Sequence, residues 1–272
     1  MELLRRVRLP WQQLRVERDG FSVSEIYKRA AGSVARDTEL IMDRYGIRVE
    51  TGERVEGDLD DVAFESISNP IALAQHLGLM KAILGCYPPD FIRFCNITQA
   101  RVADTLTLSG DPYLEESHSV GGVADSSGPI YVAALRAARN THHEILHRAD
   151  QQSGELTASK LLDWAQINPS GYLGYMGEGY YKVPEAERPH IPHGYGFISS
   201  YSRVDIFEDR ATIMEVLMTN PKRLQELTSE DKILAEKTRV LMEDLERWSG
   251  GRMDNQYFKD LWTGKVNEEY WG

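Results

Sequence analysis

Two histidines and a glutamate that could hold and use a metal ion stand together in the run His143-Glu144-Ile145-Leu146-His147. Histidines four positions apart lie one turn apart on the same face of a helix, so both imidazoles can bind one ion. Glu144 stands beside the first of them, where its carboxylate can take a proton from water bound to that ion. The pattern H-E-x-x-H therefore predicts a catalytic zinc site, with His143 and His147 as metal ligands and Glu144 as the general base.

A catalytic zinc ion needs a third protein ligand and keeps one position open for water. The extended motif with a third histidine six residues after His147 is absent, because Ser153 stands at that position. We expect Glu208 to be the third ligand, delivered by a second helix that packs against the motif helix. The alternatives are Glu215 on the same helix face, and His190 or His193 in a loop rich in glycine and proline.

Tyr201 stands seven residues before Glu208. A phenol at the rim of a zinc site can donate a hydrogen bond to the oxyanion that forms when water attacks a carbonyl. The chain has 13 tyrosines, most of which must serve packing, so the residues alone leave the role of Tyr201 open.

Three segments together resemble the zinc-binding metallopeptidases of bacteria, which belong to the zincins. The segments are T-H-H-E-x-x-H (141–147), W-x-x-I-N-P-S-G-Y (164–172) and G-F-x-S-x-Y-x6-E-D-x-A (196–211). The two metal-bearing helices are also similar to those of the catalytic domain of anthrax lethal factor. The resemblance implies that Glu208 is the third zinc ligand and that Tyr201 assists catalysis.

One position departs from this family pattern. The family often has an alanine-glutamate pair after the third ligand, and Ala211-Thr212 stands there instead. A carboxylate that supports the metal ligands from behind must then be Asp209 or Glu215, unless the site lacks one.

The segment 121–132 (GGVADSSGPIYV) resembles the edge strand that precedes the active-site helix in zincins. Such an edge can bind an extended peptide by strand addition. The resemblance therefore implies a peptide or protein substrate that lies along this strand.

The elements around these residues indicate an α+β fold. Strands are predicted over 97–108 and 129–135, with a short strand or edge loop over 119–128 between them. Helices are predicted after Asn69, after Asn140 or Thr141, after Asp205, and from Ser229 to Gly250. Strands early and helices late favour a zincin-like arrangement, with a mixed sheet packed on the motif helix and a C-terminal helical part. We expect an N-terminal region 1–68, made of helix and acidic loop, packed on a zincin-like catalytic domain 69–272; the alternative is one continuous domain.

Composition narrows the partners and the compartment. With 42 acidic and 31 basic residues the formal charge is −11, which argues against nucleic-acid binding. More than half of this charge lies in residues 50–65, which we interpret as a solvated loop. No apolar run is long enough to span a membrane, and no signal peptide is evident. We expect a bacterial protein that is cytoplasmic or exported without a cleaved leader, with Cys86 and Cys95 as free thiols.

Two other functions fit the same residues. Two histidines and a carboxylate also bind Fe(II) in non-haem oxygenases, so the chain could be a peptide-modifying hydroxylase. A closed shell of four protein ligands would instead make it a non-catalytic zinc-binding module. Zinc-dependent peptide hydrolysis is the function that the motifs favour.

Overall fold

A mixed four-stranded sheet lies on one side of the motif helix. Its strand order is β1 (Arg48–Glu50), β3 (Gln99–Ala103), β7 (Pro129–Ala133) and β6 (Gly122–Ala124). The first three strands are parallel, and β6 runs antiparallel to β7 at the edge. The structure is a computed structural model that describes residues 23–55, 58–108, 118–134, 137–154, 158–169, 175–180, 183, 195–267 and 269–271.

A second, antiparallel sheet consists of β2 (Val62–Glu65), β4 (Thr105–Leu108) and β5 (His118–Ser119). The single strand predicted over 97–108 is therefore wrong, because its two halves belong to different sheets. The break falls at Asp104, whose backbone N–H donates to the Glu65 carbonyl of β2 at 2.8 Å. That hydrogen bond takes the chain out of the first sheet and into the second.

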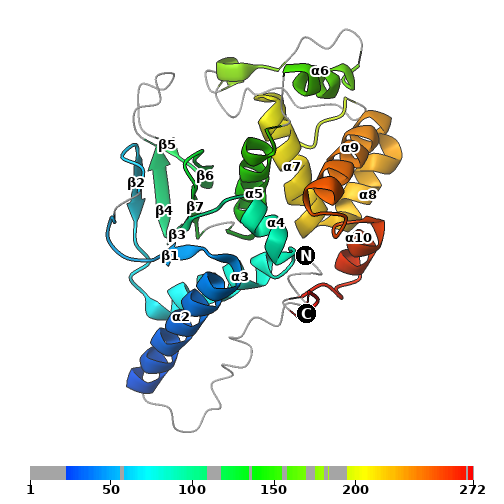
Figure 1. The fold of residues 1–272 in the computed structure, drawn as a ribbon. Coiled ribbons are helices and arrows are strands. Elements are labelled where there is room, and N and C mark those ends of the chain that lie inside the picture. The colour runs from blue at the N-terminus through cyan, green and yellow to red at the C-terminus, as the bar shows by residue number, and fades with distance from the viewer. Residues whose placement is uncertain are drawn as a thin grey trace.

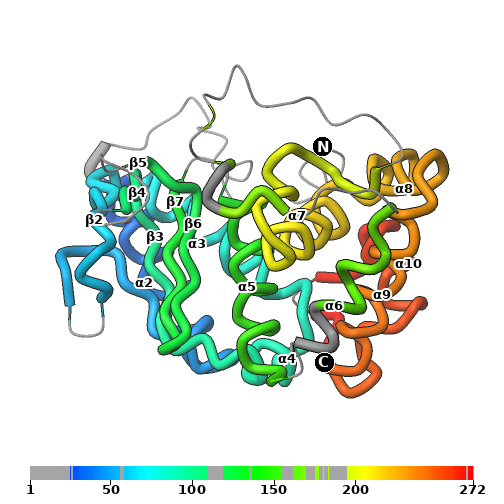
Figure 2. Tube along the Cα trace, turned by 90° about the horizontal axis from the view of Figure 1, so that it is seen from above, coloured from blue at the N-terminus to red at the C-terminus, as the bar shows by residue number. Residues whose placement is uncertain are grey.

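Some helices pack against the first sheet, and the helices late in the chain lie farther from it (Figure 1). They are α2 (Val23–Tyr45), α3 (Pro70–Leu84), α4 (Pro89–Phe94), α5 (Ala137–Ser153), α6 (Ala158–Gln166), α7 (Ile206–Thr219), α8 (Pro221–Glu230), α9 (Lys232–Trp248) and α10 (Asn255–Trp262), with the 3₁₀ turns η2 (Gly177–Tyr180) and η4 (Tyr201–Arg203). In both ribbon and trace, α5 lies between the sheet and α7, with α8 to α10 beyond (Figure 1, Figure 2). The mixed sheet and the late helices confirm the predicted α+β class. The finer zincin arrangement stays a prediction.

The motif helix α5 begins at Ala137, earlier than the predicted caps at Asn140 or Thr141. Those two side chains have other partners. Asn140 Nδ2 donates to the Gly121 carbonyl beside β6 at 2.7 Å, and Thr141 Oγ1 donates to the Ala137 carbonyl at 2.7 Å. Asn140 thus holds the sheet edge against the helix instead of capping it.

Capping residues were predicted correctly at two other helices, and the start of one more helix was misplaced. Asn69 caps α3 and Asp205 caps α7, as expected. The long helix predicted from Ser229 to Gly250 is α9, but it begins at Lys232, because Asp231 ends α8 and caps α9. Its carboxylate accepts from the backbone N–H groups of Ile233 and Leu234, each at 3.0 Å, and a new helix starts there.

Residues before the predicted boundary at 68 contribute directly to the first sheet. Strand β1 pairs in parallel with β3, and α2 packs against α3 and β1. The division into 1–68 and 69–272 stays a prediction.

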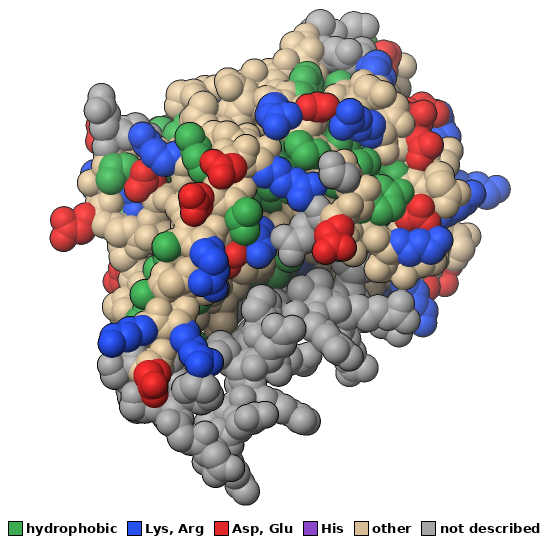
Figure 3. All heavy atoms as spheres, turned by 60° about the horizontal axis from the view of Figure 1, so that its bottom comes forward, with side chains coloured by type: hydrophobic (Ala, Val, Ile, Leu, Met, Phe, Trp, Pro, Cys, Tyr) green, Lys and Arg blue, Asp and Glu red, His purple; other side chains and the backbone are tan. Residues whose placement is uncertain are grey.

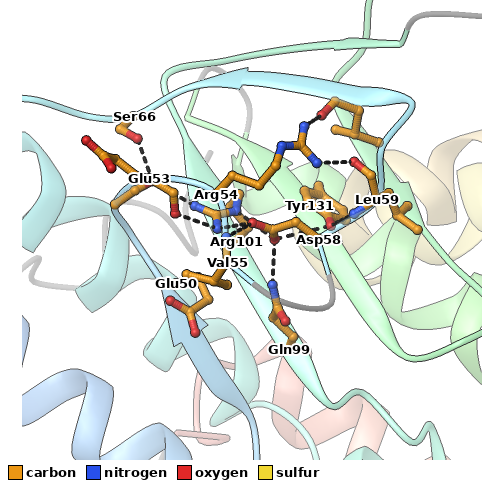
Figure 4. A network of polar contacts seen from close by, with 12 residues as sticks. Glu50, Glu53, Arg54, Val55, Asp58, Leu59, Ser66, Gln99, Arg101 and Tyr131 are labelled. Carbon is orange, nitrogen blue, oxygen red and sulfur yellow. Dashed lines mark hydrogen bonds and ion pairs between the residues drawn. The ribbon is translucent and has the colours of Figure 1, made fainter.

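The acidic stretch 50–65 is not simply a solvated loop, which corrects the prediction. Asp58 and the Arg101 guanidinium of β3 form an ion pair in which both side chains are almost fully buried. Gln99 Nε2 also donates to Asp58 at 2.7 Å, and the Tyr131 hydroxyl accepts from the Leu59 N–H at 2.6 Å (Figure 4). The loop is therefore anchored on strands β3 and β7 through one buried carboxylate.

On the face shown in Figure 3, acidic and basic side chains are interspersed rather than separated by sign.

Cys86 and Cys95 are free thiols, as predicted, and burial raises the pKa of Cys86 to about 12. Each helix within the described part of the chain is too short or too polar to cross a lipid bilayer.

Candidate metal centre

The motif histidines lie on the buried part of α5 that faces α7. His143 and His147 are one turn apart, with ring centroids separated by 4.7 Å and rings almost perpendicular. The helix packs against β6 and β7 on one side and against α7 on another. Both imidazoles are therefore fixed by packing between a sheet edge and a helix.

Glu208 reaches these histidines from the first turn of α7. The Asp205 carboxylate accepts the Glu208 backbone N–H at 2.8 Å, which caps the helix and fixes the turn that carries the ligand. An acidic side chain is also favoured at a helix N-terminus by the aligned peptide dipoles. The local sequence thus places Glu208 before any metal contributes.

The three side chains converge on one point. Glu208 Oε2 lies 2.9 Å from His143 Nε2, and Glu208 Oε1 lies 3.6 Å from His147 Nε2. Ligand atoms on a tetrahedral zinc with bonds of about 2.0 Å are about 3.3 Å apart, so these spacings fit the ion. Within the described residues, one donor atom from each of the three lies within 4.8 Å of the others.

The charges of this triad match a cation site. Burial disfavours the charged form of His143, but its contacts with Glu208 and Glu215 outweigh burial and raise its pKa to about 10. Burial opposes ionisation of Glu208 as well, yet the two histidines lower its pKa well below the usual range. The carboxylate is thus held charged, and it attracts positive charge to this position.

Glu144 is buried between α5 and the edge strand β6. A Cβ added to Gly122 would lie only 2.8 Å from Glu144 Cγ, and one added to Gly121 would lie 2.9 Å from Asn140 Cγ. The two glycines therefore let the strand approach the helix closely at the general-base candidate. Burial raises the pKa of the Glu144 carboxyl, which makes it a stronger proton acceptor when ionised.

Tyr201 lies beside the triad, in the turn η4 that packs on α7. Its ring centroid is 6.2 Å from that of His143 and 5.7 Å from that of Tyr180. The structure thus brings Tyr201 to the same place as His143, His147, Glu144 and Glu208. The roles of these five residues remain predictions.

Of the alternative ligands, Glu215 is described, and it lies apart from the point where the three side chains meet. Glu215 Oε2 faces the other ring nitrogen of His143, Nδ1, at 3.8 Å, and it does not belong to the convergent group. His190, His193 and Arg136 lie outside the described residues. The neighbouring His142 is buried and hydrogen-bonded to the Tyr87 hydroxyl at 2.5 Å, so it does not face the triad.

The arginines near the motif are held by the protein. Arg210 pairs with Asp150 at 3.0 Å and Asp244 at 2.9 Å, and so joins α7 to α5 and α9. Arg148 is buried and donates to the carbonyls of Asp125 at 2.6 Å and Asn96 at 3.0 Å. Arg210 is thus ion-paired and Arg148 is bound to backbone carbonyls, so both are held by the protein itself.

A buried polar cluster beside α7 was not predicted from the sequence. Asp209 Oδ2 accepts hydrogen bonds from Lys237 Nζ at 2.7 Å, Tyr175 at 2.9 Å and Trp164 at 3.0 Å. Lys237 also donates to the Gly196 carbonyl at 2.9 Å. Trp164 and Gly196 belong to the segments that resemble the zinc-binding metallopeptidases. The cluster connects both of them to Asp209, the residue next to Glu208. A lysine on the apolar face of α9, in line with Leu234 and Leu241, was the signal that could have revealed it.

The mixed sheet, the motif helix and the helices that follow it form an α+β fold. It is similar to a crystal structure from Bacteroides caccae ATCC 43185, described as a "putative zinc-binding metallo-peptidase". The TM-score is 0.52 and the identity 14%, over 88% of this chain and 94% of that chain. No protein-family model and no curated protein matches the sequence. At this identity the likeness shows the fold, with which the convergent triad is compatible.

Proposed function

We propose that this protein is a zinc-dependent metallopeptidase whose metal ligands are His143, His147 and Glu208. The observation that carries the proposal is the convergence of these three side chains, from two helices, at zinc-like spacing. The fold shared with the Bacteroides protein supports it. The similarity to the lethal factor catalytic domain belongs to this proposal and rests on the motifs alone.

In the proposed reaction, each residue around the triad has its own role. Zinc, when bound, supplies a Lewis acid that brings the pKa of a water at its open position close to neutrality. Glu144 takes the proton of the attacking water and passes it to the leaving amine. Tyr201 donates a hydrogen bond to the oxyanion of the attacked carbonyl. The close approach of β6 excludes water from one side of Glu144.

The edge strand β6 is the proposed place for the substrate. Among the described strands it pairs with β7 alone, and it packs directly on α5 near Glu144. An extended peptide can add to an edge strand through main-chain hydrogen bonds, which places one of its carbonyls near the metal residues.

Cleavage profiling against a peptide library tests this function. The zinc-loaded protein should cut peptides, a zinc chelator should stop cutting, and added zinc should restore it. Absence of any chelator-sensitive cleavage would contradict the proposal. Oxidised products that depend on Fe(II) and 2-oxoglutarate would point to the oxygenase instead.

Replacement of Gly122 by alanine tests the contact between the edge strand and Glu144. The added methyl group would displace the Glu144 carboxylate, and a shift of about 1 Å at a catalytic group costs about 10²-fold in rate. We expect kcat/KM to fall by roughly this factor with bound zinc unchanged. Gly121→Ala is the matched control, because it meets Asn140 rather than Glu144. Equal losses in both variants would argue against a specific effect on Glu144.

A further inference from the structure

We propose that Glu215 is a positioning residue for the metal ligand His143, and that Arg139 holds Glu215 in place. The three side chains form a chain of contacts that leads away from the metal position, from His143 to Glu215 to Arg139. The inference rests on the metal site of the proposed function, but it does not depend on peptide hydrolysis.

The two ring nitrogens of His143 face two different carboxylates of α7. Nε2 lies 2.9 Å from Glu208, and Nδ1 lies 3.8 Å from Glu215 Oε2. Positions 208 and 215 are about two turns apart on one helix face, so the imidazole lies between them. His147 also presents Nε2 to Glu208. The metal-facing nitrogen is therefore Nε2, and Nδ1 carries the proton toward Glu215.

The carboxylate of Glu215 is shared between two partners. The Arg139 guanidinium contacts Oε1 through Nε and Nη2, while Oε2 faces His143. Arg139 stands one turn before His143 on α5, so helix geometry places both partners opposite Glu215. The Glu215 and His143 side chains are each only 10% exposed, whereas Arg139 is 51% exposed. Arg139 thus supplies the ionic partner that a buried carboxylate requires.

Neighbouring polar side chains of α7 cannot take this role. The Thr212 hydroxyl donates to the Glu208 backbone carbonyl at 2.7 Å, along its own helix. Asp209 is engaged by Lys237, Tyr175 and Trp164. Glu215 is thus the acidic residue of α7 that faces Nδ1 of His143, on the side of the ring away from the metal position.

A carboxylate behind a metal-bound imidazole fixes its tautomer and makes its metal-facing nitrogen more basic. Loss of such a partner lowers metal affinity by about 10–100-fold. The same loss leaves all three ligands in place, so the number of bound zinc ions should not change.

Zinc affinity of the purified 272-residue chain, measured by competition with a chromophoric chelator, tests the inference. Glu215→Gln should raise the Kd for zinc by about 10–100-fold with one ion still bound. Arg139→Met should weaken binding in the same direction, and it should add little in the Glu215→Gln background, because both changes break the same chain of contacts. Glu226→Gln, which removes a carboxylate from the exposed pair with Arg223, should bind like the wild type.

Melting temperatures of the metal-free variants separate positioning from folding, and Arg139→Met, at a half-exposed site, provides a variant that should fold. A Kd for Glu215→Gln within twofold of wild type would overturn the inference. Complete loss of the bound ion in a folded Glu215→Gln would also overturn it, since Glu215 would then be a ligand. A wild-type chain that binds no zinc would overturn the metal site itself, which is a different and recognisable result.

Discussion

Replacing Glu144 by glutamine should lower kcat/KM for peptide hydrolysis by about 10²–10⁴-fold, the usual contribution of a positioned general base. Glutamine has the shape of glutamate but cannot accept the proton of the attacking water at neutral pH. Glu144 is buried against β6 and is not one of the three convergent ligands, so zinc should remain bound. Steady-state rates with a peptide found by library profiling, together with zinc content, measure both effects.

Glu226→Gln is again the matched control, because it removes an exposed carboxylate by the same chemical change. A Glu144→Gln protein that is folded, zinc-loaded and fully active would show that Glu144 is not the base. Loss of zinc from this variant would show instead that Glu144 helps to hold the ion.

Replacing Lys237 by methionine should lower the free energy of unfolding by about 3–5 kcal/mol, the cost of breaking a buried ion pair on one side. Both Lys237 and Asp209 are fully buried, with Nζ 2.7 Å from the carboxylate. Burial lowers the pKa of Lys237 and raises that of Asp209, and their mutual attraction opposes both shifts. Methionine fills the space but leaves the carboxylate with only the neutral donors Trp164 and Tyr175.

Chemical denaturation of the metal-free variants measures this effect without a contribution from zinc binding. The double variant Lys237→Met/Asp209→Asn should recover part of the loss, because the uncompensated charge is gone. A double variant destabilised by the sum of the two single changes would contradict a coupled pair. A loss below about 1 kcal/mol in Lys237→Met would show that the pair is not desolvated as the structure indicates.

Local signals in the sequence predicted the helices that carry the three candidate ligands. The spacing of His143 and His147 requires only a helix, and α5 is one. Asp205 caps α7 by a short-range hydrogen bond, which placed the start of the helix that carries Glu208. Asn69 did the same for α3. Such features depend on a few neighbouring residues, and therefore they can be read from the sequence.

Features that depend on distant partners could not be predicted. The strand break at Asp104 depends on a hydrogen bond to Glu65 in another strand, and β-propensity alone does not report it. In the sequence, Asp58 is one of many acidic residues, and only the fold brings Arg101 of β3 beside it. Asn140 resembles a helix cap, but the approach of Gly121 gives it a different partner. In each case tertiary structure supplied a partner that the local pattern does not contain.

The rate of peptide hydrolysis as a function of zinc added to the metal-free protein tests the central claim most directly. If His143, His147 and Glu208 form one catalytic zinc site, the rate should rise in proportion to added zinc and level off at one equivalent. The same titration of Glu208→Ala should give no comparable rise. A wild-type rate that is independent of zinc, or that stays at zero with one equivalent bound, would contradict the account.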